Sequence, residues 1–387
     1  MGGLRVQRGP RRTAASTRLA FHRAAVLMLD EARRVAADIG GLLGVDVDAA
    51  TIVAGRAAIV NLSRPGRISA GGATRLLATT DGWCAVALPR DDDIAALPAL
   101  MEVDDVVGDH WAALTRWAAT CSTDAVITRA QLLDIAAAAL GEAAAAPPVV
   151  RACGSTAPRR VDGLLVADLS SLWAGPLCGQ LLARAGAVVV KVESPKRPDG
   201  TRSGDPAFFD WMNVGKLCYA VDFDSDGDAL RRLLTAADIV IEGSRPAALR
   251  RHALSADDLP ARPGRIWLRI NGYRDRPDRP AFGDDAAVAG GLVDMAADGP
   301  MFLGDAIADP LSGLEAARAV GESLRRGGGE VIDVSMAQVA ARYAALPNST
   351  GSATHAGAPP VGRPASPLGA DNVAVERLVA ERHCAAC

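Results

Sequence analysis

Lysine, long apolar runs and an excess of charge of one sign are all scarce in this sequence of 387 residues. The net charge is -3, so the strongly basic surface that binds nucleic acid is not expected. No run of about 18 apolar residues occurs, so no segment is predicted to span a membrane. The most apolar stretch near the start, residues 19–34, is interrupted by His22 and Arg23 too early for a signal peptide. We therefore expect a cytoplasmic protein without a nucleic-acid or membrane partner.

The seven cysteines show no paired spacing, which indicates a reducing compartment rather than a disulfide framework. The C-terminal sequence HCAAC could be a metal-binding tract or a prenylation box. One histidine and two cysteines are too few for a closed metal site, however, and cysteine is an atypical last residue for such a box. We expect no metal. Among the 42 basic residues lysine occurs only at Lys191, Lys196 and Lys216, so arginine carries almost all of the positive charge.

The first part of the chain predicts a small α+β domain. Residues 1–24 are rich in Arg and Gly without periodicity, and we expect a flexible N-terminus there. The small domain is predicted at residues 25–141. Its clearest signal is Asp81 followed by Gly82 between two short apolar runs, which is the pattern of a β-hairpin. Helices are predicted near 24–44, 111–120 and 129–141.

The second part predicts a doubly wound α/β domain. After an Ala- and Pro-rich linker at 142–160, short apolar runs alternate with amphipathic helical patterns through residues 161–345. This alternation predicts a Rossmann-like parallel sheet with helices on both faces. The Pro-, Gly- and Ala-rich tail, residues 346–387, is expected to be irregular. The expected strands are LLVADL, AVVVKV, YAVDF, DIVIEG, RIWLRIN and EVIDVS, the last of them preceded by a long helix.

Two carboxylates, Asp305 and Asp309, lie in a stretch that is otherwise apolar or small. Asp309 is followed by Pro310 and an apolar period, which is the pattern of a helix N-cap with proline at the first helical position. A structural cap would stabilise the helix by about 1 kcal/mol. A carboxylate there also lies at the positive end of the helix macrodipole, which favours the ionised form and keeps it available as a nucleophile. Spacing alone leaves both roles open.

Gly175 and Gly179 open a predicted helix after a predicted strand, and Glu193 ends the next strand. The order is similar to a dinucleotide-binding fingerprint, but the glycines are spaced GxxxG rather than GxGxxG, so nicotinamide binding is not predicted. Cations in NVGK, residues 213–216, and in EGSRPAALRR, residues 242–251, lie near predicted strand ends. Open α/β sheets bind ligands at that edge, and several cations together would suit a phosphate-rich cofactor.

Four segments, in the same order, resemble the family III coenzyme A transferases. This group includes the formyl-CoA and carnitine-CoA transferases and the 2-methylacyl-CoA racemases. The resemblance covers about residues 160 to 340 and is more specific than any single motif. The segments are VADLSSLWAGPLCGQLLARAGAVVVKVESP, MNVGKLCYAVDF, ADIVIEGSRP and GDAIADPLSGLEAARAV, the last of them continuing to GGGEVIDVSM.

The resemblance implies an acyl-CoA:carboxylate CoA-transferase that works through a covalent aspartyl mixed anhydride and an aspartyl-CoA thioester. In the family an aspartate in a segment like ADxxxG is the nucleophile, and Asp309 occupies that position. Asp305 has no corresponding role, and we assign it to a loop. The implied substrates are an acyl-CoA and a carboxylic acid, and the implied assembly is a homodimer. By the same likeness coenzyme A would lie along Leu172, Trp173, Ser194, Asn213, Lys216, Ser244 and Arg251, with the cations near its phosphates.

Three departures from the family pattern bear on function. The position of Trp173 is Gln in the formyl-CoA branch, which disfavours oxalate and formate as substrates. The racemase branch carries GHD where this chain has GDD at 283–285, so a two-base proton transfer would need another base. The small domain comes first instead of following or interrupting the CoA-binding domain, as a circular permutation or half of a tandem architecture would explain. The alternatives are therefore an acyl-CoA racemase or epimerase and a non-catalytic CoA-binding homologue.

Overall fold

The computed structural model describes residues 23–62, 66–346, 358–359 and 362–384. Its centre is a seven-stranded sheet in the order β4-β12-β9-β8-β5-β6-β7, parallel except for β4 at one edge. Counted along the chain, the parallel strands follow the order 3-2-1-4-5-6, which reverses between β5 and β8. This confirms the Rossmann-like α/β fold. The strands are β4 (Val149–Ala152), β5 (Leu165–Asp168), β6 (Val188–Glu193), β7 (Leu217–Ala220), β8 (Ile239–Glu242), β9 (Ile266–Asn271) and β12 (Glu330–Ser335).

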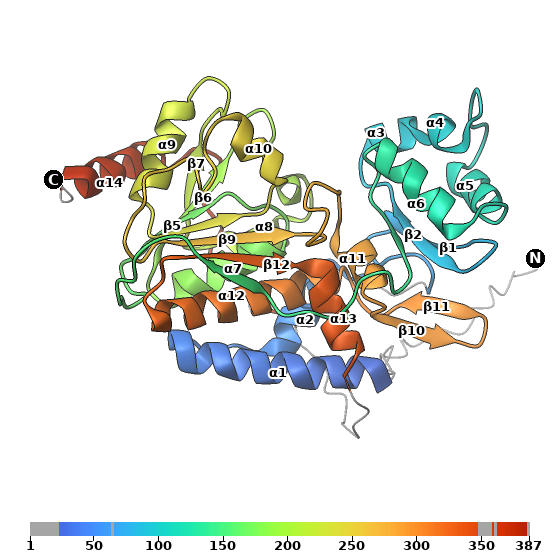
Figure 1. Cartoon of the computed structure of the whole chain (residues 1–387), viewed down its shortest axis with the longest axis horizontal. Coiled ribbons are helices and arrows are strands. Elements are labelled where there is room, and N and C mark those ends of the chain that lie inside the picture. Colours follow the sequence, from blue (N-terminus) through green and yellow to red (C-terminus); the bar gives the residue numbers. More distant parts are fainter. Residues whose placement is uncertain (1–22, 63–65, 347–357, 360–361, 385–387) are drawn as a thin grey trace, which may run out of the picture.

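Helices cover both faces of this sheet (Figure 1). Because strand side chains alternate, Val166 joins the apolar cluster on one face while Leu165 and Ala167 join the cluster on the other. The first cluster includes α7 (Ala174–Arg184), α8 (Pro206–Asn213), α12 (Ala308–Arg326) and α13 (Met336–Ala344). The second includes α9 (Gly227–Ala236), α10 (Pro246–Arg251) and α14 (Asn372–Cys384). A short 3-10 helix, η1, spans Gly200–Ser203.

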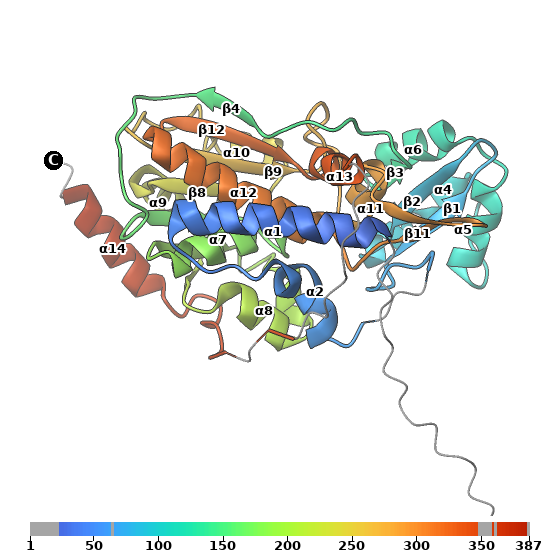
Figure 2. The same ribbon diagram turned by 90° about the horizontal axis from the view of Figure 1, so that it is seen from below.

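The N-terminal helices α1 (Arg23–Leu43) and α2 (Ala49–Ile59) pack on the Rossmann-like domain. The helix predicted near 24–44 is confirmed, but its assignment to the small domain is wrong. It carries an apolar stripe at helical spacing, from Met28 through Val35 to Ile39, that is buried in the same cluster as α12. Figures 1 and 2 both show α1 lying along α12, and in Figure 1 it covers the side of α12 that faces away from the sheet.

The small domain is built on the antiparallel sheet β1-β2-β3, with β1 (Thr74–Ala78), β2 (Trp83–Ala87) and β3 (Ala137–Ala139). The predicted hairpin is confirmed, since β1 and β2 pair on either side of Asp81 and Gly82. The helix predicted at 129–141 ends at Leu132, because Asp134 adopts a positive φ of 59° and the alanines beyond it pair with β2. The other helices are α3 (Asp91–Ala95), α4 (Leu97–Met101), α5 (His110–Ala118) and α6 (Thr123–Leu132).

A segment of the second predicted domain completes this small domain. It contains α11 (Gly283–Ala289), β10 (Val293–Ala296) and β11 (Gly299–Phe302). Val288 and Phe302 pack against Leu76 and Ala85, on the face of the small sheet that α3–α6 leave open. The predicted boundary at 142–160 therefore places α11, β10 and β11 in the second domain, although they pack on the small one. The sequence does not show this, because their partner strands lie far away in the chain.

The predicted linker and tail both contribute regular structure. Strand β4 lies in the linker and pairs with β12. Helix α14 lies in the tail. The side-chain amide of its first residue, Asn372, donates to the carbonyl of Ala220 at the end of β7 and accepts the N–H of the same residue. The flexibility expected for residues 1–24 falls almost entirely outside the described residues, as does the last part of HCAAC. None of the helices in the described part of the chain combines the length and the hydropathy that crossing a bilayer requires.

The close approach of α12 and α7 gives a stability prediction. A Cβ added at Gly313 would lie 2.7 Å from the carbonyl oxygen of Ala174 and 2.8 Å from Cδ2 of Leu177. We expect Gly313→Ala to destabilise the protein by about 1–3 kcal/mol, because the two helices must separate, although alanine by itself favours a helix by about 1 kcal/mol. The matched control is Gly227→Ala at the start of α9, where an added Cβ meets nothing within 4 Å. Urea unfolding of both variants checks this, and equal stability of Gly313→Ala and the unchanged protein would contradict it.

Candidate active site

The candidate site lies at the carboxyl edge of the parallel sheet, where the strand order reverses. The segments that follow β5 and β8 touch there, since a Cβ added at Gly243 would lie 3.0 Å from Cβ of Ser170. The loop after β5 is held in place by Asp199, whose carboxylate accepts the backbone N–H of Leu172 at 3.2 Å. Leu172 adopts a positive φ of 70° and is partly exposed. This reversal point is where open α/β sheets bind their ligands.

Asp309 lies in the first turn of α12, at the same edge of the sheet. The prediction that it is the N-cap is wrong, because the helix begins at Ala308 and Ile307 is the cap residue. Its backbone N–H donates to the carbonyl of Ala306 at 2.9 Å, and the nearby backbone of Gly283 lowers the pKa of its carboxyl. A Cβ added at Gly283 would lie 2.3 Å from Oδ2 of Asp309. Only glycine therefore lets the start of α11 approach this carboxyl so closely.

Asp284 connects the starts of α11 and α12. Its Oδ1 accepts the backbone N–H of Ala306 at 3.0 Å, and its Oδ2 accepts the hydroxyl of Thr74 at 3.3 Å, so the small domain reaches the site through β1. Ala306, held between Asp284 and Asp309, has a φ of 42°. A non-glycine residue in that region is strained by about 1–3 kcal/mol, so the surrounding contacts hold this turn in place.

The carboxyls of this cluster have raised pKa values. Burial raises the pKa of Asp309 to about 7, with a further contribution from the negative charge of Asp284. Burial, followed by the charge of Asp305, raises the pKa of Asp284 to about 6. The expectation that the helix macrodipole keeps Asp309 ionised is therefore wrong in direction, because desolvation and neighbouring carboxylates outweigh the dipole. Asp309 is nevertheless partly exposed, so one side of the residue reaches solvent.

Arg56 of α2 is a site residue that the sequence did not reveal. It forms an ion pair with Asp305, whose side chain is 3% exposed. Asp305 does lie in a loop, as expected, but it is buried. The Arg56 guanidinium also lies 5.4 Å from the ring centroid of Phe208, which meets Trp173 edge-on at 5.4 Å. No motif marks Arg56, and 249 residues separate it from Asp305, so only the folded chain shows the contact.

The residues predicted to bind coenzyme A divide into two groups. Leu172, Ser194 and Ser244 follow β5, β6 and β8 at the carboxyl edge, and each is at least partly exposed. Arg251 is exposed at the end of α10. Trp173, in contrast, is 2% exposed and packs inside the apolar core.

Lys216 and Asn213 are structural, and the prediction that Lys216 lies near the phosphates of coenzyme A is wrong. All three donors of its buried ammonium group are used, by Asp168 at 2.9 Å, the carbonyl of Pro176 at 2.8 Å and Asn213 at 3.0 Å. Gly179 makes room for this contact, because a Cβ there would lie 2.7 Å from Oδ2 of Asp168. The group therefore ties β5 to α7 and to the residues before β7.

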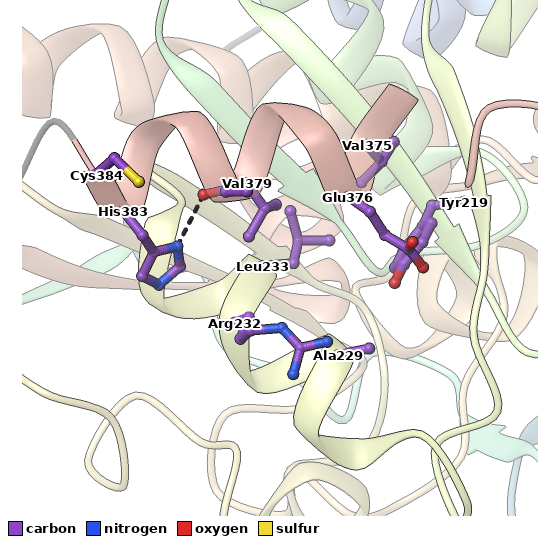
Figure 3. A pocket seen from close by; sticks show the side chains of 10 residues that line it. Tyr219, Ala229, Arg232, Leu233, Val375, Glu376, Val379, His383 and Cys384 are labelled. Atoms are coloured by element: carbon purple, nitrogen blue, oxygen red, sulfur yellow. Dashed lines mark hydrogen bonds between the residues drawn. The ribbon is translucent and has the colours of Figure 1, made fainter. Parts of the chain in front are cut away.

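A pocket elsewhere on the molecule contains none of the predicted site residues. It lies between α9 and α14, with Arg232, Glu376 and His383 around an apolar floor (Figure 3). Within the described ranges, no group of three or more His, Cys, Asp or Glu side chains is arranged to hold a metal ion.

Comparison with known proteins agrees with this architecture. The model of CoA-transferase family III matches residues 161–367, and the chain belongs to that family. It is 32% identical to the succinyl-CoA–D-citramalate CoA-transferase of Chloroflexus aurantiacus over 46% of this chain and 50% of that protein. It is also 32% identical to the succinate–glutarate CoA-transferase of Agrobacterium fabrum, over 52% and 56% of the two chains.

Among solved structures, that of the hypothetical protein Rv3272 from Mycobacterium tuberculosis is 31% identical, with a TM-score of 0.44 over 49% of this chain and 57% of that one. The chain spans about half the length of the curated relatives that it matches. Residues 1–160, which include Thr74 and Arg56, lie outside the family match.

The structural role of Lys216 can be tested against a second lysine. Lys216→Met would leave Asp168 buried without its nearest cation, and we expect a loss of about 3–5 kcal/mol in the free energy of unfolding. The control is Lys196→Met, because Lys196 pairs with Asp222 at 2.7 Å but is 65% exposed. That change should leave the free energy of unfolding nearly unchanged, because solvent screens an exposed ion pair. Urea unfolding measures both, and a stable Lys216→Met protein with weakened CoA binding would restore the original prediction.

Proposed function

We propose that this chain is an acyl-CoA:carboxylate CoA-transferase with Asp309 as its nucleophile. The observation that carries the proposal is the Asp309 carboxyl at the ligand-binding edge of a family III fold, on the residue that matches the family's nucleophile. The carboxylate attacks the thioester carbonyl of an acyl-CoA and expels the CoA thiolate, leaving a mixed anhydride. The thiolate then attacks the aspartyl carbonyl and releases the donor acid, so that Asp309 carries CoA as a thioester.

The second half of the reaction repeats these steps in reverse. The acceptor carboxylate attacks the aspartyl thioester, which again gives a mixed anhydride and free thiolate. Attack of the thiolate on the acceptor carbonyl forms the new acyl-CoA and returns Asp309 as a carboxylate. The backbone of Gly283 lies against the Asp309 carboxyl and favours its ionised form, so we propose that its N–H stabilises negative charge that develops on that group.

The raised pKa of Asp309 supports this role. A carboxylate that has lost part of its hydration is more basic and more reactive than one in water, provided that it is ionised. With a pKa of about 7, Asp309 is ionised in a substantial fraction of molecules at neutral pH. We propose that coenzyme A passes Leu172, Ser194 and Ser244 with its phosphates toward Arg251. The names of the two relatives pair succinate or its CoA ester with a second dicarboxylic acid, so short dicarboxylates are the first substrates to test.

One observation favours a second candidate, an acyl-CoA racemase or epimerase. Asp284 stands where the racemase branch carries histidine, and its pKa of about 6 lies close to that of Asp309. Two adjacent groups that exchange protons near neutral pH could move a proton across the α-carbon of an acyl-CoA. Deuterium exchange at that carbon in D₂O, without an acceptor acid, would support this function over CoA transfer.

The nucleophile assignment predicts a large loss on substitution. We expect Asp309→Asn to lower the rate of isotope exchange between succinyl-CoA and labelled succinate by at least about 10³-fold, because the amide cannot form the anhydride. The control is Asp298→Asn, which removes an exposed carboxylate paired with Arg67 and should change the rate less than about twofold. Exchange that survives in Asp309→Asn would exclude Asp309 as the nucleophile. CoA binding without exchange in the unchanged protein, across a panel of acids, would indicate a non-catalytic homologue.

The pH dependence follows from the same carboxyl. The ionised form is the nucleophile, and its raised pKa means that it is mostly protonated below about pH 6. The exchange rate should therefore rise with pH and level off above pH 8. Its apparent midpoint should lie near 7 and belongs to Asp309 and Asp284 together, because the two carboxyls titrate as a coupled pair. A rate that is constant between pH 5 and 8 would contradict a raised pKa for the reacting group.

A further inference from the structure

We propose that Arg56, on a helix outside the family match, is a positioning residue that acts with Asp305 to set the charge of the Asp309 carboxyl. The inference rests on the proposed function, in which Asp309 is the nucleophile. It adds a role for the N-terminal segment, which no family likeness assigns.

The largest charge effects on the Asp309 carboxyl come from three elements. Helix α11 contributes Asp284, the loop before α12 contributes Asp305, and α2 contributes Arg56. Asp285, the next residue of α11, accepts the backbone N–H of Phe282 at 2.7 Å, and its charge interacts with Asp284 and then with Arg279. Among the largest of these charge effects, Arg56 is the cation, and Asp284 and Asp305 are the carboxylates.

Arg56 is held in place by contacts that do not involve Asp309. One is the ion pair with buried Asp305, and the other is the stacking over Phe208 at 5.4 Å. Helix α2 is itself fixed against α8, because a Cβ added at Gly55 would lie 2.5 Å from the ring of Trp211. The second oxygen of Asp305, Oδ2, is buried and has no hydrogen-bond partner in the described structure. Arg56, which binds Oδ1, is therefore the main partner that stabilises the Asp305 carboxylate. The guanidinium is thus a fixed charge against the loop that leads into Asp309.

The pair gives opposite expectations for its two members. Arg56 lowers the pKa of Asp309 and Asp305 raises it, and the effect of Arg56 is the larger. Without Arg56, the midpoint of Asp309 should rise whether Asp305 stays ionised or becomes neutral, because the larger effect is lost in both cases. Without the charge of Asp305, Arg56 is left uncompensated and the midpoint should fall. A pair with a purely structural role would not produce shifts of opposite sign.

The experiment titrates the Asp309 carboxyl directly by infrared difference spectroscopy of the whole chain, with Asp309→Asn as the blank, and measures the exchange rate in parallel. We expect Arg56→Gln to move the midpoint to higher pH by about one unit, Asp305→Asn to move it to lower pH, and Arg56→Lys to restore most of the original value. The matched control is Arg67→Gln, because Arg67 also pairs with an aspartate and stacks over a ring, at 4.7 Å from Trp83. It should leave the midpoint unchanged.

The outcomes separate this inference from the proposed function. An Asp309 midpoint that does not respond to Arg56→Gln or Asp305→Asn, in variants that keep the unchanged protein's melting temperature, overturns the inference even if exchange proceeds. Should Arg56→Gln unfold the protein, Arg56→Lys and Asp305→Asn still decide. Opposite shifts without any exchange activity would support the inference and overturn the transferase proposal instead.

Discussion

The candidate site depends on one constraint, the burial of the Asp309 carboxyl among other carboxyls, one of which is paired with Arg56. Three acidic groups in a desolvated space cannot all be ionised at modest cost, so their pKa values are raised. Gly283 is what allows it, since any side chain there would collide with Oδ2 of Asp309. The reactivity that we propose for Asp309 is a consequence of this crowding and not of the helix terminus on which it lies.

The rest of the fold serves to bring these groups together. The parallel sheet places the ends of β5 and β8 side by side, and the packing of α12 on α7 through Gly313 sets the start of α12 beside that edge. The buried Lys216–Asp168 pair connects β5 to the residues before β7. Segments outside the family match then add Thr74 and Arg56. The candidate site is therefore assembled from both parts of the chain, although the family likeness covers only one.

The sequence predicted those features that depend on local pattern. Alternating apolar runs predicted the parallel sheet, Asp81 and Gly82 predicted the hairpin, and the ADPLSG segment singled out Asp309. Features that depend on distant contacts were wrong or absent. The sequence predicted that the helix terminus keeps Asp309 ionised and that Lys216 lies near the phosphates of coenzyme A. It does not show that Asp284 and Asp168 lie beside these two residues. Arg56 could not be found, since its partner Asp305 is 249 residues away. The packing of α1 on α12 was missed for the same reason.

The most direct test of the central claim is to locate the covalent intermediate. The protein would be incubated with succinyl-CoA and treated with hydroxylamine, which converts an aspartyl thioester or anhydride to a hydroxamate. The masses of its peptides would then be measured by mass spectrometry. We predict the added mass on Asp309 and its absence from the Asp309→Asn protein. A label on another residue, or no label while CoA binds and exchange proceeds, would contradict the role proposed for Asp309.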